Sequence, residues 1–181
     1  MGQAKPPRPV KLILAMTSQS DKALDWALAK AESSWGDIWA KGPRFDFDHT
    51  RFYHPTMGNQ LIKQLVSFAT LIDPGDLAEL KLQTNQWEAE YAESSSLDCE
   101  RPLNLDPGYL TEAKLVLATV KNRDHRIYLS DGIYAEVTLA YHGKQWNGSR
   151  WTYPDYLTDF NLEFLTRCRD HLRSQLHNSA N

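Results

Sequence analysis

Continuous apolar runs and apolar residues at helical spacing alternate along the first part of the chain. Val10–Met16 is a short run that is apolar except for Lys11, which is typical of a buried strand. Leu24, Leu28 and Trp35 then recur at helical spacing, and Gly36 is a residue type that commonly follows the end of a helix. The pattern therefore predicts a strand followed by one amphipathic helix.

The middle of the chain predicts two strands and a second helix. Arg44–Asp48 alternates aromatic and charged residues, and Leu61–Ile72 is rich in residues that favour strands. Asp73 is a good N-cap and Pro74 suits the first helical position. A helix is therefore predicted from this boundary to about Ala92.

The last third of the chain predicts two strands and a final helix. Ala113–Val120 and Ile133–Tyr141 are the strand candidates. From about Asn161, Leu165 and Leu172 fall on one helical stripe. The chain is expected to end in this helix and a short tail.

These elements follow one another in the order βαββαββα. We expect an α+β fold: a two-layer sandwich of a mainly antiparallel sheet with helices on one face, as a ferredoxin-like variant with an added hairpin and helix. A three-layer α/β fold is the alternative. The expected organisation is a flexible leader at 1–9, a single α+β domain at 10–177 and a disordered tail at 178–181.

Composition excludes several classes of protein. The 181 residues are 41% apolar and 24% charged, as in a globular domain, and the net charge of −3 gives no general attraction to nucleic acid or anionic membranes. The sequence has no apolar run long enough to cross a membrane and no signal peptide. Cys99 and Cys168 lack zinc-site spacing. We therefore expect a cytoplasmic protein, without a membrane or nucleic-acid partner.

The most polar connection between predicted strands is Lys121–Arg126, which carries three cations, one anion and one histidine. Lys121 and Arg123 can hold phosphate or carboxylate, and His125 can transfer protons near neutral pH. A solvated loop in which Asp124 neutralises its neighbours is the alternative interpretation.

Alternation along 133–141 divides that strand into two faces. Tyr134, Glu136 and Thr138 share one face, and Lys114 would lie opposite Glu136 if this strand pairs with 113–120. Such a pair could bind a polar ligand or form an ordinary cross-strand ion pair. The opposite, core-facing set is Ile133, Ala135, Val137, Leu139 and Tyr141.

Leu103–Leu110 contains Asp-Pro-Gly and is predicted to be a rigid turn. It would hold Asp106 and Tyr109 at the mouth of a site. An aromatic-rich segment follows later in the chain and would either stack on a ligand or pack on the core: Trp146, Trp151, Tyr153 and Tyr156.

Asp46 and Asp48 leave a predicted strand on the same side, and His49 follows them. Oxygen and nitrogen ligands of this kind suit a divalent metal ion. Alternation at the edge of a sheet would produce the same pattern, so the metal site is a hypothesis.

Several long segments resemble the uncharacterised bacterial domain-of-unknown-function family 4416, over about residues 10–160. These segments are Leu71–Pro74, Leu77–Asn85, Leu103–Leu110, Ala113–Val120, His125–Leu129, Ile133–Leu139 and Trp151–Tyr156. The resemblance implies a single bacterial cytoplasmic domain and names no activity or cofactor. Similar sequences sometimes carry a GTP-binding label, whereas this chain has neither a P-loop nor the Asn-Lys-x-Asp order that reads guanine.

Two functions remain open from the sequence, besides a scaffold that uses an exposed sheet face or the aromatic segment to bind a partner chain. The first is a binding module for a small anionic ligand, a nucleotide or phosphate ester, with these candidate residues: Lys114, Lys121, Arg123, His125, Tyr134, Glu136, Asp106 and Tyr109. The second is a hydrolase or transferase that uses Asp, Glu and His groups, with or without a metal. Neither the cofactor nor the oligomeric state follows from the sequence.

Overall fold

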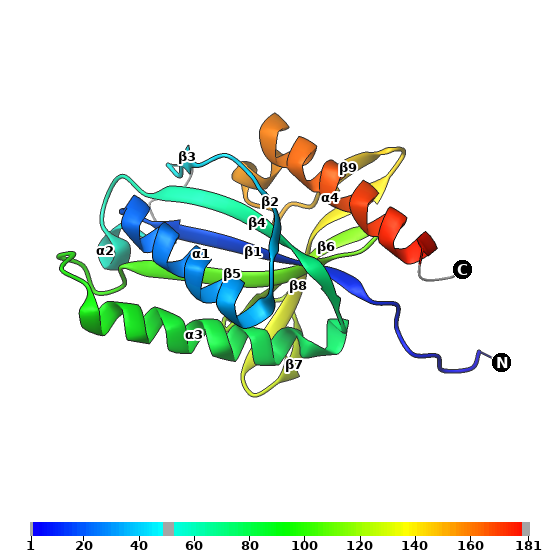
Figure 1. The fold of residues 1–181 in the computed structure, drawn as a ribbon, viewed down its shortest axis with the longest axis horizontal. Coiled ribbons are helices and arrows are strands. Elements are labelled where there is room, and N and C mark those ends of the chain that lie inside the picture. The colour runs from blue at the N-terminus through cyan, green and yellow to red at the C-terminus, as the bar shows by residue number, and fades with distance from the viewer. Residues whose placement is uncertain (1, 49–52, 179–181) are drawn as a thin grey trace.

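The computed structural model describes residues 2–48 and 53–178. These residues form one antiparallel sheet of nine strands with helices packed on it (Figure 1). The strands are β1 (Val10–Ser18), β2 (Ile38–Lys41), β3 (Phe45–Asp46), β4 (Ile62–Ile72), β5 (Leu103–Leu110), β6 (Lys114–Thr119), β7 (Ile127–Ser130), β8 (Ile133–His142) and β9 (Gln145–Gly148). The helices are α1 (Asp21–Trp35), α2 (His54–Met57), α3 (Leu77–Ser94) and α4 (Asp159–Asn178), with 3-10 turns at Pro74–Asp76 and Pro154–Leu157.

The first half of the sheet is ferredoxin-like, as the sequence predicted. Its strand order is β2-β4-β1-β5, and every neighbouring pair is antiparallel. β1 and β2 both flank β4, so the β1-α1-β2 unit joins two parallel strands with a third between them. The β4-α3-β5 unit does the same around β1. Two such split βαβ units define this arrangement.

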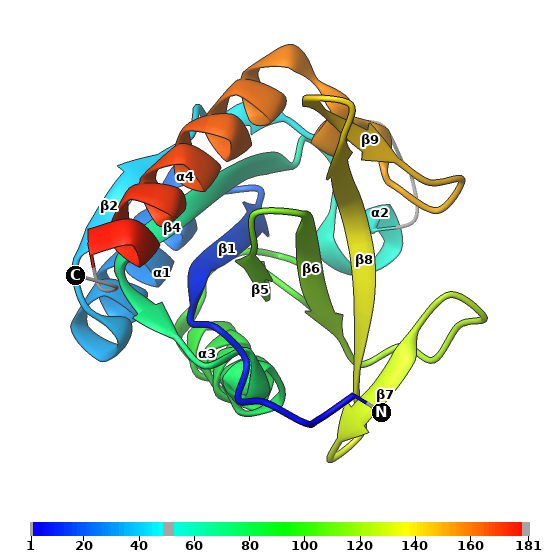
Figure 2. The same ribbon diagram turned by 90° about the vertical axis from the view of Figure 1, so that its right-hand side faces the viewer.

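The second half extends the sheet beyond β5 in the order β6-β8-β7, with β9 paired to the far end of β8. β7 and β8 are joined by Asp131 and Gly132, whose φ values are 51° and 79°. Positive φ at both central residues is the geometry of a tight hairpin turn that Asp-Gly favours. The extension places β7 at the outer edge of the sheet (Figure 2).

Helices cover both faces of the sheet. α1 and α3 share one face, where Leu24 and Trp87 pack on Leu14 and Phe68 of the central strands. α4 covers the other face with a stripe that includes Leu165. The predicted α+β class with an antiparallel sheet is therefore confirmed, but the expectation that the helices share one face is wrong, because the C-terminal helix lies on the face opposite to α1 and α3 (Figure 2).

Two helix boundaries follow from local chemistry. The Asp73 carboxylate accepts a hydrogen bond from Gly75 N at 2.7 Å, so Asp73 caps the turn that leads into α3, as predicted. Gly36, with φ of 90°, follows the last residue of α1. None of the described helices combines the length and the apolar character needed to cross a lipid bilayer.

The prediction that Leu103–Leu110 is a turn is wrong, because this segment is the central strand β5. Gly108 permits it: a Cβ at this position would lie 2.3 Å from the Val116 carbonyl oxygen of β6. Pro107 is tolerated because β5 pairs with β6 only from Gly108 onwards. Its missing N–H therefore removes no bond to that strand.

The predicted faces of β8 are also wrong beyond its first half. An extra residue, Thr138, sits between the β8 residues that pair with Leu115 and Val116. This bulge reverses the alternation, so Leu139 packs on the α4 face while Ile133 packs on the α3 face. Val137, predicted to be core, is half exposed, and Glu136 is nearly buried.

Candidate functional site

A polar pocket lies where β5 and β6 stop pairing. Among the described residues, these strands pair only through Gly108–Leu110 and Leu115–Leu117. The first half of β5 therefore has β1 alone as a paired strand. The pocket beside it has a volume of about 70 Å³, against roughly 10–15 Å³ for a single water on the same measure. It has room for a phosphate-sized group.

Cationic side chains dominate the lining of this pocket within the described residues. Five of them line it: Lys63, Lys81, Arg101, Lys121 and Arg126. Two carboxylates, Asp106 and Glu136, also line it. Aromatic side chains complete the walls: Phe47, Tyr53, Tyr153 and Tyr156. We call this site the cationic pocket.

Side chains of α3 satisfy the open edge of β5. Lys81 Nζ donates to the Leu105 carbonyl at 2.6 Å, and Leu105 N donates to Glu88 Oε1 at 2.7 Å. The second Glu88 oxygen accepts from Arg101 Nη2 at 2.8 Å. A neighbouring strand would otherwise use these backbone groups, and leaving them unpaired in a buried place is costly. The helix thus fixes two pocket cations while it completes the strand.

Asp106 is the acid at the centre of this part of the pocket. Its two oxygens accept from Lys81 Nζ at 3.0 Å and from Asn104 Nδ2 at 2.8 Å. Burial alone would raise the pKa of Asp106, but Lys81, Asn104 and Arg101 together lower it below its usual 3.8. Asp106 is therefore ionised at neutral pH and balances part of the positive charge.

Lys63 enters the pocket from the start of β4. Its Nζ lies 2.6 Å from Asp155 Oδ2, and both side chains are nearly or fully buried. The same ammonium lies 4.1 Å from the ring centre of Tyr156 and 4.8 Å from that of Phe47. This buried pair ties the 3-10 turn at Pro154–Leu157 to the sheet, so it positions the aromatic wall.

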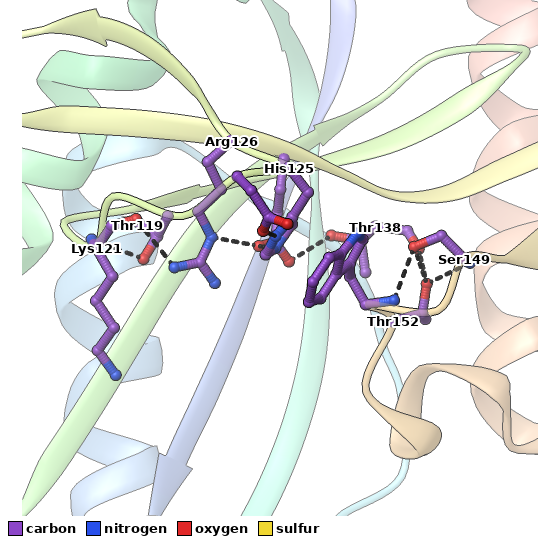
Figure 3. A network of polar contacts seen from close by, with 10 residues as sticks. Thr119, Lys121, His125, Arg126, Thr138, Ser149 and Thr152 are labelled. Carbon is purple, nitrogen blue, oxygen red and sulfur yellow. Dashed lines mark hydrogen bonds and ion pairs between the residues drawn. The ribbon is translucent and has the colours of Figure 1, made fainter.

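Lys121 and Arg126 come from the connection between β6 and β7 (Figure 3). Arg126 Nε donates to Glu136 Oε2 at 2.7 Å, and its Nη1 donates to the Lys121 carbonyl at 3.0 Å. Lys121 N donates to Thr119 Oγ1 at 3.2 Å. These contacts fold the polar connection back onto the sheet instead of leaving it in solvent.

The surroundings of Lys121 disfavour its positive charge. Burial contributes most to a lowered pKa, and Arg101 lowers the pKa further. Asp106 opposes this shift, while Arg126 and Arg123 add to it. A lysine whose ammonium is repelled by nearby cations gains most from a bound anion.

Two tyrosines of the pocket, Tyr53 and Tyr156, stay protonated. Burial raises the pKa of Tyr53, and the Asp106 charge and Tyr153 raise it further. Burial and the Asp155 charge likewise raise the pKa of Tyr156 well above 10. Protonated phenols are hydrogen-bond donors, so these side chains suit an anion better than a cation.

The other end of the network holds His125 (Figure 3). Its Nε2 lies 3.2 Å from Glu136 Oε2 and its Nδ1 lies 3.3 Å from Asp124 Oδ1. The imidazole stacks on Trp151, with ring centres 4.5 Å apart and planes 10° apart. Because each ring nitrogen faces a carboxylate, His125 is held in place, and it lines a neighbouring groove instead of the cationic pocket.

The structure divides the candidate residues from the sequence among several places. Lys121, Asp106 and Glu136 line the cationic pocket. Tyr109, Lys114 and His125 instead line a neighbouring groove along β7 and β8, to which Glu136 also contributes. Two candidates lie elsewhere: Arg123 is exposed, and Tyr134 packs edge-on against Tyr128.

The predicted pairing of Lys114 with Glu136 is wrong. In the β6–β8 ladder Lys114 lies opposite Ala140, and Glu136 lies opposite Leu117. The β8 bulge at Thr138 changes the register between these two pairs. Glu136 takes Arg126 as its partner instead.

The structure describes two of the three residues of the predicted metal site, Asp46 and Asp48. Asp46 ends the two-residue strand β3, and Asp48 follows it in an exposed position. His49 lies outside the described residues. Within 2–48 and 53–178, no group of three or more His, Cys, Asp or Glu side chains is placed to hold a metal ion. The site at Asp46, Asp48 and His49 stays a prediction.

Four pocket cations were not among the candidate residues from the sequence: Lys63, Lys81, Arg101 and Arg126. Lys81 and Glu88 occupy positions four and eleven residues after Leu77, on the stripe that includes buried Thr84. Charged residues on an apolar helical stripe are the signal that could have revealed them. Lys63 likewise falls in the otherwise buried first half of β4.

The fold and the pocket together define a class: a ferredoxin-like α+β protein with an extended sheet and a cationic pocket at a strand divergence. The chain belongs to the family described as "Domain of unknown function (DUF4416)", which matches residues 8–172. The resemblance noted from the sequence is therefore confirmed. Neither the search of curated proteins nor the search of solved structures returned a significant match.

Proposed function

We propose that the protein is a binding module for a small anionic ligand, and that the cationic pocket holds the phosphate group of a nucleotide or phosphate ester. The observation that carries this proposal is the gathering of five cations in the described lining. Four carboxylates balance part of this charge, Asp106 and Glu136 in the lining and Glu88 and Asp155 paired to lining cations, which leaves one positive charge in excess. The lowered pKa of Lys121 supports it, because repulsion by Arg101 adds to the larger effect of burial, and a bound anion would relieve that repulsion.

The size of the pocket supports entry by the charged group alone. At about 70 Å³ the pocket suits a phosphate, and the rest of a nucleotide or ester would extend beyond it. Tyr53 and Tyr153 are only partly buried, so their rings can contact that remainder. Arg101 is one-third exposed and supplies a guanidinium that suits phosphate oxygens.

Thermal unfolding with defined anions tests this function. Inorganic phosphate, a nucleoside monophosphate and a simple sugar phosphate would each be added at constant ionic strength, with chloride as the reference. A ligand at 100 times its Kd stabilises the folded state by about 2.7 kcal/mol. For a chain of this length, that corresponds to a rise in Tm of roughly 5–10 °C. No rise with any phosphate compound would overturn the proposal.

A pair of lysine variants locates the binding. Lys121→Met removes a pocket cation, and loss of one charge-assisted hydrogen bond of about 1.5–3 kcal/mol weakens phosphate binding by roughly 10–100-fold. Lys22→Met, on the exposed face of α1, changes the net charge equally and is the matched control. Calorimetric titration should therefore show weaker binding for the first variant alone. Equal weakening of both would indicate nonspecific attraction.

The second candidate, a hydrolase or transferase, has weaker support at this pocket. A general base works best with a pKa near the working pH. The pKa of Asp106 is lowered instead, and both ring nitrogens of His125 face carboxylates. Incubation with a chromogenic phosphate ester is the direct test, and turnover abolished by Asp106→Asn would favour the enzyme over the binding module.

We further propose that the protein acts in the cytoplasm, with residues 10–177 as one domain. Cys99 is partly exposed and Cys168 is buried, and neither forms a disulfide. Unpaired cysteines fit a reducing compartment. The bacterial origin that the resemblance implies stays a prediction.

A further inference from the structure

Strand β7 presents an open and strongly apolar edge. It is the last strand on the path through the sheet, and β8 is its only partner among the described strands. Three consecutive apolar residues are exposed along it: Ile127 at 72%, Tyr128 at 58% and Leu129 at 40%. An edge of this kind has unpaired backbone N–H and C=O groups beside side chains that water solvates poorly.

The apolar surface extends beyond the strand itself. Eight large apolar side chains are exposed in the described part of the chain, and five of them lie on β7 or in the groove beside it: Ile127, Tyr128, Leu129, Val137 and Trp151. A groove beside the strand is lined by Ile127, Leu129, Val137 and Trp151 among others. Concentrated exposure of this kind marks an interaction surface in soluble proteins.

Only some of the devices that protect an edge strand act on β7, which is short and has a register irregularity between Tyr128 and Ser130. Such strands usually carry lysine, proline or an inward-pointing charge, or are covered by a helix or loop. The four residues of β7, Ile-Tyr-Leu-Ser, contain no charge and no proline. Figure 2 shows β7 on the outside of the sheet, with no helix over its free edge.

We propose that β7 pairs with β7 of a second copy of this chain, so that two sheets join into one across a two-fold axis. Antiparallel self-pairing fits because the flanks of the strand carry opposite charges. Arg123 precedes the strand and Asp131 follows it, and both are exposed. A two-fold arrangement brings the Arg123 side of each copy towards the Asp131 side of the other.

The pairing would provide partners for the backbone groups, the apolar side chains and the flanking charges of β7. The open backbone groups of each β7 bond to those of its copy, as in strand addition to a sheet edge. The exposed apolar side chains of β7 gain a partner strand beside them, and the flanking charges compensate each other. Because the strand has only four residues, the contact is small and the dimer dissociates on dilution.

Light scattering coupled to size-exclusion chromatography, over a dilution series of the full chain, tests this pairing. The mass should rise from 20.8 kDa towards twice that value as concentration increases. Leu129→Lys places a charge on the edge and should return the protein to single-chain mass. Leu157→Lys is the matched control, because Leu157 is 41% exposed and lies in the 3-10 turn away from β7.

A second variant tests the charge complementarity. Asp131→Asn keeps a residue that tolerates the positive φ of 51° but removes the charge. It should weaken the dimer at low salt and have little effect at high salt, where exposed charges are screened. A single-chain mass at every concentration, or equal dimerisation of the Leu129→Lys and Leu157→Lys variants, would overturn the proposal. The first outcome would leave the edge to a strand from a different protein.

Discussion

Lys11 provides the sharpest test of the energetics, because it is a buried lysine in the central strand β1 without a carboxylate partner among the described residues. Its side chain is fully buried, and Nζ donates to the Phe68 carbonyl at 3.0 Å. Nζ also lies 5.4 Å from the Trp39 ring centre. The titratable groups that face it belong to α4: Cys168 and His171. Burial lowers the pKa of Lys11 from 10.5 to about 8, and Cys168 opposes this shift.

The change in pKa sets a free-energy cost. A shift from 10.5 to about 8 corresponds to a loss of about 3 kcal/mol of folding stability at neutral pH. The unfolded chain holds the proton more tightly, so the cost is fully present below pH 8. It fades as the pH rises from 8 to 10.5. Lys11→Met keeps the length of the side chain and removes this cost, while it also loses one hydrogen bond of about 1–3 kcal/mol.

We therefore expect Lys11→Met to be as stable as the wild type or more stable at pH 7, by up to about 2 kcal/mol. The wild type should gain about 2 kcal/mol on the variant between pH 7 and about 9.5. Urea unfolding of both proteins at several pH values measures this difference. A gap between the two proteins that is independent of pH would refute the reasoning.

Lys63→Met is the matched control, since Lys63 is equally buried but pairs with Asp155. Its removal leaves a buried carboxylate uncompensated, so this variant should lose about 3–5 kcal/mol. Two buried lysines in adjacent strands are thus expected to respond in opposite directions. If both substitutions destabilised the fold alike, burial of charge would not be the deciding factor.

Three further predictions address the strand divergence, the cap of α3 and the pocket. Gly108→Ala should lower the free energy of unfolding by at least about 1–3 kcal/mol, because the added Cβ would lie 2.3 Å from the Val116 carbonyl oxygen. Urea unfolding measures this change, and an unchanged midpoint would contradict the close approach of β5 and β6. Asp73→Ala should cost about 1 kcal/mol through loss of the bond from Gly75 N, and Asp73→Asn should restore most of it. The third prediction concerns pH above about 8, where a phosphate ester is fully ionised. The pKa of Lys121 is lowered from 10.5, so the affinity for phosphate measured by calorimetry should fall as Lys121 loses its proton. Lys121→Arg should remove this fall, because arginine keeps its charge.

Much of the fold follows from local patterns in the sequence. Strand β4 and helix α3 were both predicted near their observed bounds, because periodicity and the Asp73 cap act over a few residues. The ferredoxin-like core followed from the order of those elements. Strand β5 was missed because Asp-Pro-Gly favours a turn, and only its neighbours β1 and β6 explain why these residues are extended there.

The pocket was less accessible to sequence reasoning. Its cations come from positions as far apart as Lys63 and Arg126, and no spacing rule links them. The β8 bulge at Thr138 also changes which residues face the site, and the extra residue in the register becomes visible only once the two strands are paired. Glu136 was found because it is a charged residue in an otherwise apolar strand, although its partner was wrong.

The central position of β1 has a consequence for the order in which the protein is made. β1 is synthesised before every other strand, yet its two neighbours are β4 and β5, so its second edge is filled only after residue 110 has left the ribosome. Until then, an almost entirely apolar segment has at most one partner strand. Its side-by-side pairing with residues about one hundred positions later slows folding. Nascent chains that stop before β5 should therefore depend on a chaperone. Lys11 is the one charged residue of β1, so it alone contributes a charge to the solvation of this segment before β5 is made.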